Sequence, residues 1–398
     1  MSSKLKKHQW DEIGDFLNHW FYKPDLDALA ISLAAYISHL DLSIEPVWLF
    51  VIGPSSTGKT HIICNALNCL PSVREISDIT PSSFVSGMKK KSGGYSLLFD
   101  LPKIGKDPNK TQATLVFPDF SSVMGMRFED RAALMKHLRQ IYDGRFNPLK
   151  GVALAQREWA GKISVIAAVT NSVERAWAVQ RDLGERFIQV RWARGDGESM
   201  ALSAIAQLEN PDIISKFQTM VKSFVDINTI PKVGLPNTTM RNQLAALSDL
   251  VARLRGAVIR DSHRTIIEVP EPEGTGRLVK ALINLATGHA KLFRKTEVDD
   301  KDISLAVRTA LDSVPGTRLK VFNALGLGST ENDIAKITGL QHSIVEYSLE
   351  ELRAMDLVVE VKTNNITIYE LVDEFAKLRN KALGSNYNVI DFKKKENA

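Results

Sequence analysis

Apolar residues recur at helical spacing throughout residues 1–45, which predicts a helical N-terminal segment. The first such set consists of Trp10, Ile13, Phe16, Leu17 and Trp20. A second set runs from Leu26 to Leu40, and Pro24 lies between the two sets as a helix-breaking residue. We therefore expect two helices before the first strand.

A continuous apolar run follows at Val47–Ile52, a pattern typical of a strand that is buried on both faces of a parallel sheet. Four more strand candidates alternate with helical stretches, and this alternation predicts an α/β sheet with crossover helices. The four candidates are Val73–Ile79, Thr114–Asp119, Ile163–Thr170 and Phe187–Trp192.

Residues 200–312 show a mainly helical pattern, apart from a strand candidate at Thr265–Val269, and Pro315 and Gly316 then mark a boundary. Beyond it, three helical stretches precede two β-rich segments separated by an Asn364-Asn365 turn, which is the layout of a winged helix-turn-helix. These segments are Arg318–Leu325, Ser329–Thr338, Ser343–Met355, Leu357–Lys362 and Ile366–Leu371. We expect the polar, basic residues 376–398 to form a frayed tail.

Composition is that of an ordinary globular protein, because 44% of the 398 residues are hydrophobic and 24% are charged. The length favours two or three domains. No apolar run approaches the roughly 20 residues of a membrane helix, and no secretory signal is visible. Two cysteines cannot build a disulfide framework or a four-ligand zinc site. We therefore expect a cytoplasmic protein without membrane contact, and the net charge of +5 is too small to indicate nucleic-acid binding by itself.

The segment Gly53–Thr60 reads Gly-Pro-Ser-Ser-Thr-Gly-Lys-Thr and matches G-x-x-x-x-G-K-[ST] at every defined position. It follows a buried strand and opens a predicted helix, as a phosphate-binding loop requires. Glycines let backbone amides close around a phosphate, and the helix N-terminus adds a favourable dipole. We expect Lys59 to reach the β- and γ-phosphates of ATP and the Thr60 hydroxyl to hold Mg²⁺. The expected nucleotide-binding residues are Gly53, Pro54, Ser55, Ser56, Thr57, Gly58, Lys59, Thr60 and His61.

Four segments follow this loop: a strand ending in Asp119, a strand followed by Asn171, the run Arg181–Phe187, and a helix that begins near Arg241. With the loop, their order and spacing resemble AAA+ ATPases, most closely the minichromosome-maintenance helicases and related ATPases of mobile-element replication. The resemblance covers about residues 45–312, with the winged helix as an appended part. It implies an α/β P-loop AAA+ fold, a parallel sheet with helices on both faces and a helical lid. The expected domains are an N-terminal helical segment (1–45), an AAA+ core (46–198), a helical lid (199–314), a winged helix (315–375) and a basic tail (376–398).

The Walker B place is occupied by Leu115-Val-Phe-Pro-Asp119-Phe120, a hydrophobic strand that ends in one carboxylate. Asp119 would orient Mg²⁺ or its bound water, unless it is an ordinary strand-end carboxylate. The family pattern is Asp-Glu, whereas Phe120 follows Asp119 here, so one carboxylate is missing from its usual place. The residues that could supply it are Glu129, Asp130 and Asp143.

The resemblance assigns roles to three further residues. Asn171 follows the sensor-1 strand, where its amide either positions the attacking water or caps the next turn. Arg186 matches the arginine finger, which would neutralise charge on the γ-phosphate of a neighbouring subunit's ATP. Arg181 is the second choice for this role. The alternative is that Arg186 forms a surface salt bridge. Arg241 stands at a helix start whose dipole does not favour a cation, and it resembles sensor 2 unless it faces solvent. The expected cap of that helix is Thr238 or Thr239.

Two insertions are candidates for DNA contact. Residues 86–113 hold six lysines and two aspartates, a net charge of +4, which suits a phosphate backbone unless the segment is a solvated loop. Residues 151–163 occupy the place of a hairpin whose tip meets DNA in the family, and Trp159 there could stack on bases or anchor the hairpin to the core. The residues expected at DNA are Lys89, Lys90, Lys91, Arg157 and Trp159.

The winged unit carries the opposite charge. Thr317–Glu370 holds five basic and eight acidic residues, and its expected recognition helix contains Glu346, Glu350 and Glu351. Because acidic residues repel phosphate, we expect this unit to be a protein-contact or ring-lid module first, with operator recognition as the alternative.

The leading hypothesis is an ATP-driven DNA translocase or helicase that acts as a homo-oligomeric ring, expected to be hexameric, on single-stranded or forked DNA in mobile-element replication. Its winged helix would recruit replication partner proteins. The second hypothesis is a non-translocating switch, a loader, initiator or regulatory ATPase that assembles on ATP binding and recruits a partner; the missing glutamate and the acidic winged unit favour it. A metabolic P-loop kinase would explain Lys59 and Thr60, but neither the sensor segments nor the winged unit.

Overall fold

The computed structural model describes residues 3–40, 44–84, 96–104, 106, 110–147, 158–175, 186–193, 195–326, 330–363 and 366–384. The chain divides into two compact units. The first consists of Met1–Pro236 with Ile283–Ala306, and the second of Asn237–Leu282 with Val307–Ala398.

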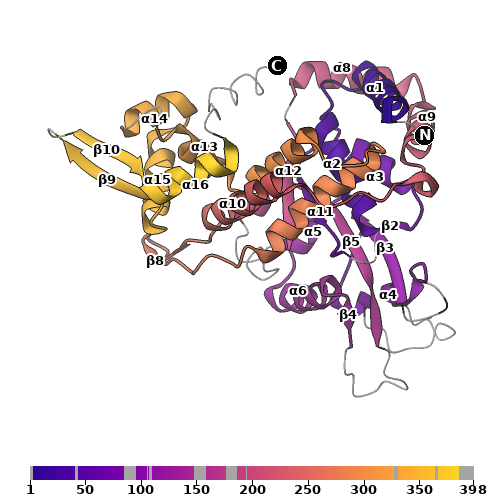
Figure 1. Cartoon of the computed structure of the whole chain (residues 1–398), viewed down its shortest axis with the longest axis horizontal. Coiled ribbons are helices and arrows are strands. Elements are labelled where there is room, and N and C mark those ends of the chain that lie inside the picture. The colour runs from indigo at the N-terminus through magenta and orange to yellow at the C-terminus, as the bar shows by residue number, and fades with distance from the viewer. Residues whose placement is uncertain are drawn as a thin grey trace. The chain divides into compact units, whose positions relative to one another are not determined.

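The first unit is built on a mostly parallel sheet with the strand order β2-β3-β5-β1-β6 (Figure 1). The strands are β1 (Trp48–Ile52), β2 (Val73–Glu75), β3 (Lys110–Phe117), β5 (Trp159–Val169) and β6 (Phe187–Arg191). A short strand, β4 (Arg145–Phe146), pairs antiparallel with the start of β5. The strand β5 therefore lies between β1 and β3, with Ile52 opposite Val169 and Phe117 opposite Ala167.

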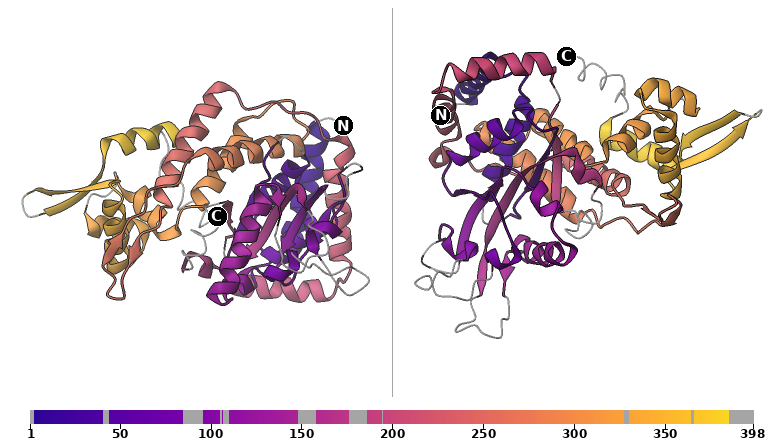
Figure 2. Two further views of the ribbon diagram at one scale, coloured as in Figure 1. Left: turned by 90° about the horizontal axis from the view of Figure 1, so that it is seen from below. Right: turned by 180° about the vertical axis from the view of Figure 1, so that it is seen from behind.

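Helices cover both faces of this sheet, as Figure 2 shows. All five residues of β1 are buried, which explains its uninterrupted apolar sequence. Trp48, Phe50 and Ile52 join a core with apolar residues of α6 (Phe128–Tyr142), while α2 (Leu26–His39) contacts β1, β3, β5 and β6. Smaller elements complete the sheet's surroundings: α3 (Lys59–Asn68), η1 (Pro81–Phe84), α4 (Leu97–Asp100), α5 (Ser121–Met124) and η3 (Asn171–Arg175).

The N-terminal helices belong to this unit and do not form a separate domain. The ammonium of Lys6 in α1 (Ser3–Trp20) donates hydrogen bonds to the carbonyl oxygens of Ser223 and Phe224, at the end of α9 (Ile213–Val225). The Trp10 and Phe224 rings pack with their centroids 5.2 Å apart. The expected two helices in residues 1–45 are confirmed, but they pack on the same core as α9.

The expected helical lid, residues 199–314, is split between the two units. Its part in the first unit includes α8 (Gly197–Leu208), α9 and η4 (Ile227–Thr229). Its part in the second unit includes α10 (Thr238–Leu254), β7 (Ile259–Arg260) and β8 (Ile266–Glu268). The division crosses α11 (Gly276–Leu292) and α12 (Asp300–Asp312), so the expected boundaries at 198 and 314 do not coincide with it.

The second unit contains the three helices and two strands expected near the C-terminus (Figure 1). These are α13 (Gly316–Ala324), α14 (Glu331–Thr338), α15 (His342–Ala354), β9 (Val358–Thr363) and β10 (Ile366–Leu371), with β9 and β10 paired antiparallel. The expectation of a frayed tail from residue 376 is wrong as far as residue 383. Residues Asp373–Leu383 form α16, which buries Phe375 and Ala382 and packs on α10. In the parts of the chain that the structure describes, no helix combines the length and apolar character needed to cross a bilayer.

Candidate functional site

The loop after β1 has the backbone of a phosphate-binding loop. Gly58 has φ +79° and Ser56 has φ +60°, both in the left-handed region, and glycine adopts this region without strain. At Gly53 a Cβ atom would lie 3.0 Å from the Cβ of Trp192, so a side chain would crowd the loop. The helix α3 begins directly after Gly58 without a side-chain cap. Its first backbone N–H groups are thus suited to bind an anion.

A buried cation lies inside this loop. Lys59 is only 6% exposed, and its Nζ donates a 2.9 Å hydrogen bond to the carbonyl oxygen of Pro54. Burial lowers the pKa of the Lys59 ammonium, and the nearby Asp119 and Cys64 oppose that shift. A carbonyl compensates a buried charge less well than an anion does, so the loop fits a phosphate oxygen at this place.

The end of β3 approaches the loop and supplies one carboxylate. The Thr60 hydroxyl donates to the carbonyl oxygen of Pro118 at 3.4 Å, and the exposed Asp119 accepts a 2.8 Å bond from the backbone N–H of Ser121. A hydroxyl and a carboxylate are oxygen ligands of the kind that Mg²⁺ prefers. Within the described residues no group of three or more His, Cys, Asp or Glu side chains could hold a metal by itself. The fit to Mg²⁺ therefore rests on Thr60, Asp119 and phosphate oxygens.

Phe120, which stands where the family has glutamate, is part of the core. Its side chain is fully buried, and its ring packs against Phe50 and Phe117 with centroids 5.5 and 5.2 Å away. The residue after Asp119 is thus committed to packing. Glu129 and Asp130 lie exposed in the first turn of α6, and their role as a substitute base stays a prediction.

Asn171 follows β5, and the sheet order sets this strand between β1 and β3. The phosphate loop follows β1 and Asp119 follows β3, and the carboxyl ends of parallel strands meet at one edge of a sheet. Asn171, which follows β5, therefore comes from a strand end between the two. The Gly53 N–H donates a 3.1 Å bond to the Val169 carbonyl oxygen, which ties the two strand ends together. The sensor-1 role of Asn171 stays a prediction.

Arg186 lies at the opposite edge of the sheet. It precedes Phe187, which pairs with Trp48 at the start of β1, whereas Gly53 follows the end of β1. Arg186 and Gly53 therefore lie six residue steps apart along the strands, which at about 3.3 Å per residue is about 20 Å. This separation exceeds the reach of an arginine side chain, so Arg186 does not reach the phosphate loop of its own chain. Arg181, the second choice, lies outside the described residues.

Arg186 is paired with Asp143, the residue that ends α6. One guanidinium nitrogen of Arg186 lies 3.4 Å from both carboxylate oxygens of Asp143, and the guanidinium carbon lies 5.3 Å from the Tyr142 ring centre. Asp143 was one of three candidates for the missing Walker B carboxylate. That assignment is wrong, because Asp143 lies with Arg186 at the far edge of the sheet.

Arg241 belongs to the second unit and lies exposed in the first turn of α10. Its Nη2 donates a 3.2 Å bond to the Thr238 hydroxyl. The helix is capped by Asn237, whose side chain accepts from the Met240 N–H at 3.0 Å, so the expected cap at Thr238 or Thr239 is wrong. The sensor-2 role of Arg241 stays a prediction.

Of the residues predicted to contact DNA, the structure describes Trp159. Lys89, Lys90, Lys91 and Arg157 lie outside the described residues. Trp159 is 1% exposed, its Nε1–H donates a 2.8 Å bond to the Thr111 hydroxyl, and its ring lies over Gly161. The assignment of Trp159 to a DNA surface is therefore corrected, and the alternative of a core anchor holds.

The acidic α15 is partly neutralised within the second unit. Arg260 of β7 donates a 2.7 Å bond to Glu350, and its guanidinium carbon lies 3.7 Å from the Tyr347 ring centre. Arg318 of α13 donates a 2.7 Å bond to Glu351. One face of the expected recognition helix is thus occupied by residues of its own unit.

No sequence pattern singled out Trp192 or Ser121. The Trp192 Nε1–H donates to the Thr57 carbonyl oxygen at 3.1 Å and so braces the phosphate loop from β6. The buried Ser121 hydroxyl, two residues after Asp119, has no hydrogen-bond partner among the described residues. The role of Trp192 has no motif, because it depends on where the chain after β6 returns to the loop.

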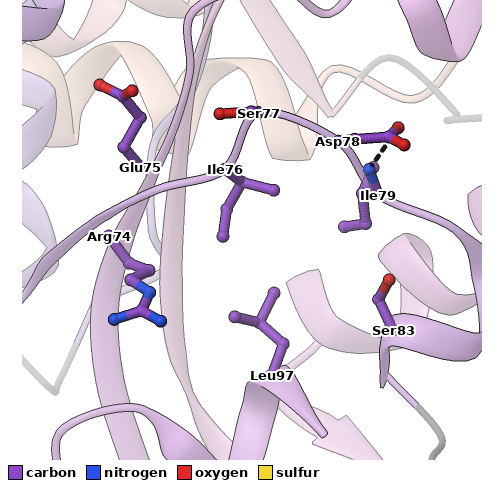
Figure 3. Close-up of a pocket in the computed structure, with 8 residues that line it drawn as sticks. All are labelled: Arg74, Glu75, Ile76, Ser77, Asp78, Ile79, Ser83 and Leu97. Atoms are coloured by element: carbon purple, nitrogen blue, oxygen red, sulfur yellow. Dashed lines mark hydrogen bonds between the residues drawn. The ribbon is translucent and has the colours of Figure 1, made fainter. Parts of the chain in front are cut away.

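A separate cavity of about 310 Å³ lies beside β2 (Figure 3). Its lining includes Arg74 from β2, Leu97 from α4, and Asp78, whose carboxylate accepts from the Ile79 N–H at 2.8 Å. None of the residues of the phosphate loop, nor Asp119 or Asn171, lines it, so it is not the site assembled above.

In a comparison with known proteins, neither a protein-family model nor a curated protein matches the chain.

Proposed function

We propose that this chain is an AAA+-type ATPase that binds ATP and Mg²⁺ at the Gly53–His61 loop and hydrolyses the nucleotide. The observation that carries the proposal is the buried Lys59 beneath a left-handed turn, at the uncapped start of α3 and the end of a central parallel strand. Such a loop is built to receive a phosphate, and the adjoining strand end supplies the Asp119 carboxylate.

The residues of this site divide the work of phosphoryl transfer. Lys59 neutralises charge at the β- and γ-phosphates, and the α3 amides hold phosphate oxygens. Thr60 and Asp119 would hold Mg²⁺, which when bound supplies further neutralisation of phosphate charge. Asn171 would orient a water through its side-chain amide.

In this proposal, several copies of the chain assemble because Arg186 acts on the nucleotide of a neighbouring copy. Because it lies about 20 Å from its own loop along the strands, it completes the site of a second copy. A contact that joins two different edges of the same chain is head-to-tail, and repeated head-to-tail contacts close into rings or continue as filaments. The proposed assembly is a ring, in which every site uses residues of two copies.

The proposed use of hydrolysis is movement along single-stranded or forked DNA as a helicase or translocase of mobile-element replication. Its support is the +4 charge of residues 86–113, because clustered lysines bind phosphate backbones. The second candidate is a non-translocating switch that assembles on ATP and recruits a protein. Two observations favour it: Phe120 fills the place of the catalytic glutamate, and Trp159 is not exposed for stacking.

ATP hydrolysis measured with and without single-stranded DNA, together with strand displacement from a forked duplex, separates these candidates. A helicase shows DNA-stimulated hydrolysis and displacement. A switch hydrolyses slowly, assembles in the presence of a non-hydrolysable ATP analogue and displaces no strand. A chain that neither binds nor hydrolyses ATP contradicts both candidates.

A further inference from the structure

The last turn of α6 forms a seat for the Arg186 side chain. Two consecutive residues contribute to it: Tyr142 lies beneath the guanidinium and Asp143 faces one of its nitrogens. A ring face and a carboxylate together constrain both the plane of a guanidinium and its rotation within that plane. The seat therefore determines the direction in which Arg186 points.

This seat is attached firmly to the sheet. The Asp143 N–H donates to the Arg139 carbonyl oxygen, and the Gly144 carbonyl oxygen accepts a 3.0 Å bond from the N–H of Gly161 in β5. Gly144 has φ +77°, and a Cβ atom there would meet the Gly161 carbonyl oxygen at 3.0 Å. The Tyr142 ring packs against Trp48 of β1 with centroids 5.2 Å apart. The position of Asp143 is thus determined by two central strands.

The two members of the ion pair differ strongly in exposure. The Arg186 side chain is 6% exposed, whereas the Asp143 side chain is 56% exposed. Burial of the whole Arg186 side chain, guanidinium included, removes most of its rotamer freedom before a second copy binds, which is the usual condition for precise catalytic placement. The exposed carboxylate marks where solvent, or a second copy, reaches the pair.

We propose that Asp143 is a positioning residue: it orients Arg186 toward the phosphates of a nucleotide held by a second copy of the chain, an inference that rests on the proposed function. A carboxylate could also compete with phosphate for the guanidinium. The separation of 3.4 Å is long compared with about 2.7–2.9 Å for a strong charge-assisted bond, so this competition is weak.

Steady-state ATP hydrolysis by the full-length chain tests this role with Asp143→Ala, Arg186→Ala and the double variant. We expect Asp143→Ala to lower kcat by about 10²-fold, because a catalytic group displaced by about 1 Å loses that much rate. The KM for ATP should stay within about twofold, since the phosphate loop of the same copy is intact. The double variant should be no slower than Arg186→Ala, because Asp143 acts through Arg186 alone.

Two further variants separate positioning from general damage. Asp143→Asn keeps an oxygen acceptor and should recover part of the rate. Asp249→Asn is the matched control, because Asp249 is also an exposed carboxylate paired with an arginine, Arg253 at 3.0 Å, but on a helix of the second unit. It should hydrolyse ATP as the unchanged chain does.

The positioning role is overturned if Asp143→Ala is as fast as or faster than the unchanged chain while Arg186→Ala is inactive. It is equally overturned if the losses from the two substitutions multiply in the double variant. Absence of ATP hydrolysis by the unchanged chain, or full activity of Arg186→Ala, is a different result and contradicts the proposed function itself.

Discussion

The buried hydrogen bond between Trp159 and Thr111 allows a quantitative test of the corrected role of Trp159. Trp159→Phe keeps an aromatic ring in the core but removes the indole N–H that the Thr111 hydroxyl accepts at 2.8 Å. Thr111 is fully buried, so its hydroxyl loses a partner that water does not readily replace. An unsatisfied buried polar group costs about 1–3 kcal/mol, and we expect the free energy of unfolding to fall by that amount.

A double-mutant cycle makes this prediction specific to the hydrogen bond. Thr111→Val alone should also destabilise the first unit, because it leaves the indole N–H without an acceptor. Combining Trp159→Phe with Thr111→Val removes both polar partners together and leaves neither group unsatisfied, so the loss of stability in the double variant should be smaller than the sum of the two single losses.

Urea unfolding followed by circular dichroism measures the midpoints of all four proteins. A Trp159→Phe protein with an unchanged midpoint, or a double variant whose loss equals the sum of the single losses, would show that the bond to Thr111 does not stabilise the core. Electrophoretic mobility shift with single-stranded DNA supplies the second readout. The affinity for single-stranded DNA should be the same in Trp159→Phe and the unchanged chain, because the ring at position 159 does not face solvent.

Lys59→Ala should abolish ATP hydrolysis, and Asp119→Asn should strongly reduce the Mg²⁺-dependent rate, because each removes a charge that the loop and the β3 end supply; retained turnover in a phosphate-release assay would contradict these roles. Replacing Lys89, Lys90 and Lys91 together with Ala should lower the log–log salt slope of single-stranded DNA binding by about 2, from about 0.7 per phosphate contact, and an unchanged slope would show that these lysines do not contact DNA. Burial lowers the pKa of His289, outweighing the opposing effect of its partner Asp302, so the unfolded chain binds a proton at higher pH than the folded chain. Stability from this group is therefore complete above about pH 6.5 and declines as pH falls toward the lowered pKa; the urea midpoint should drop less between pH 7 and pH 5 in His289→Gln, and an equal drop would contradict this.

Buried strands and the phosphate loop could be predicted from the sequence because each has a local pattern. The run Val47–Ile52 is apolar on both faces, and the loop combines fixed glycines with a lysine. The structure starts β3 at Lys110 and β5 at Trp159, several residues before the predicted strands. Those extra residues are mixed in polarity, because they pair with neighbouring strands but only some of them enter the core.

Long-range contacts could not be predicted in the same way. Asp143 and Arg186 meet because the end of α6 lies beside the start of β6, which depends on tertiary packing that no local pattern specifies. The helix α16 escaped prediction because it is largely polar and buries only Phe375 and Ala382. Trp159 remained ambiguous until the bond to Thr111 showed which way its ring is held.

Mixing two inactive variants tests the shared site most directly. Lys59→Ala lacks a working phosphate loop but keeps Arg186, and Arg186→Ala keeps the loop but lacks the arginine. We expect each variant to hydrolyse ATP poorly alone, since an arginine finger contributes about 10³–10⁵ in rate. Mixtures should regain activity at interfaces that combine an intact loop with an intact arginine. Mixtures that co-assemble, as measured by native mass spectrometry, and yet stay inactive at every ratio would contradict a site formed by two copies.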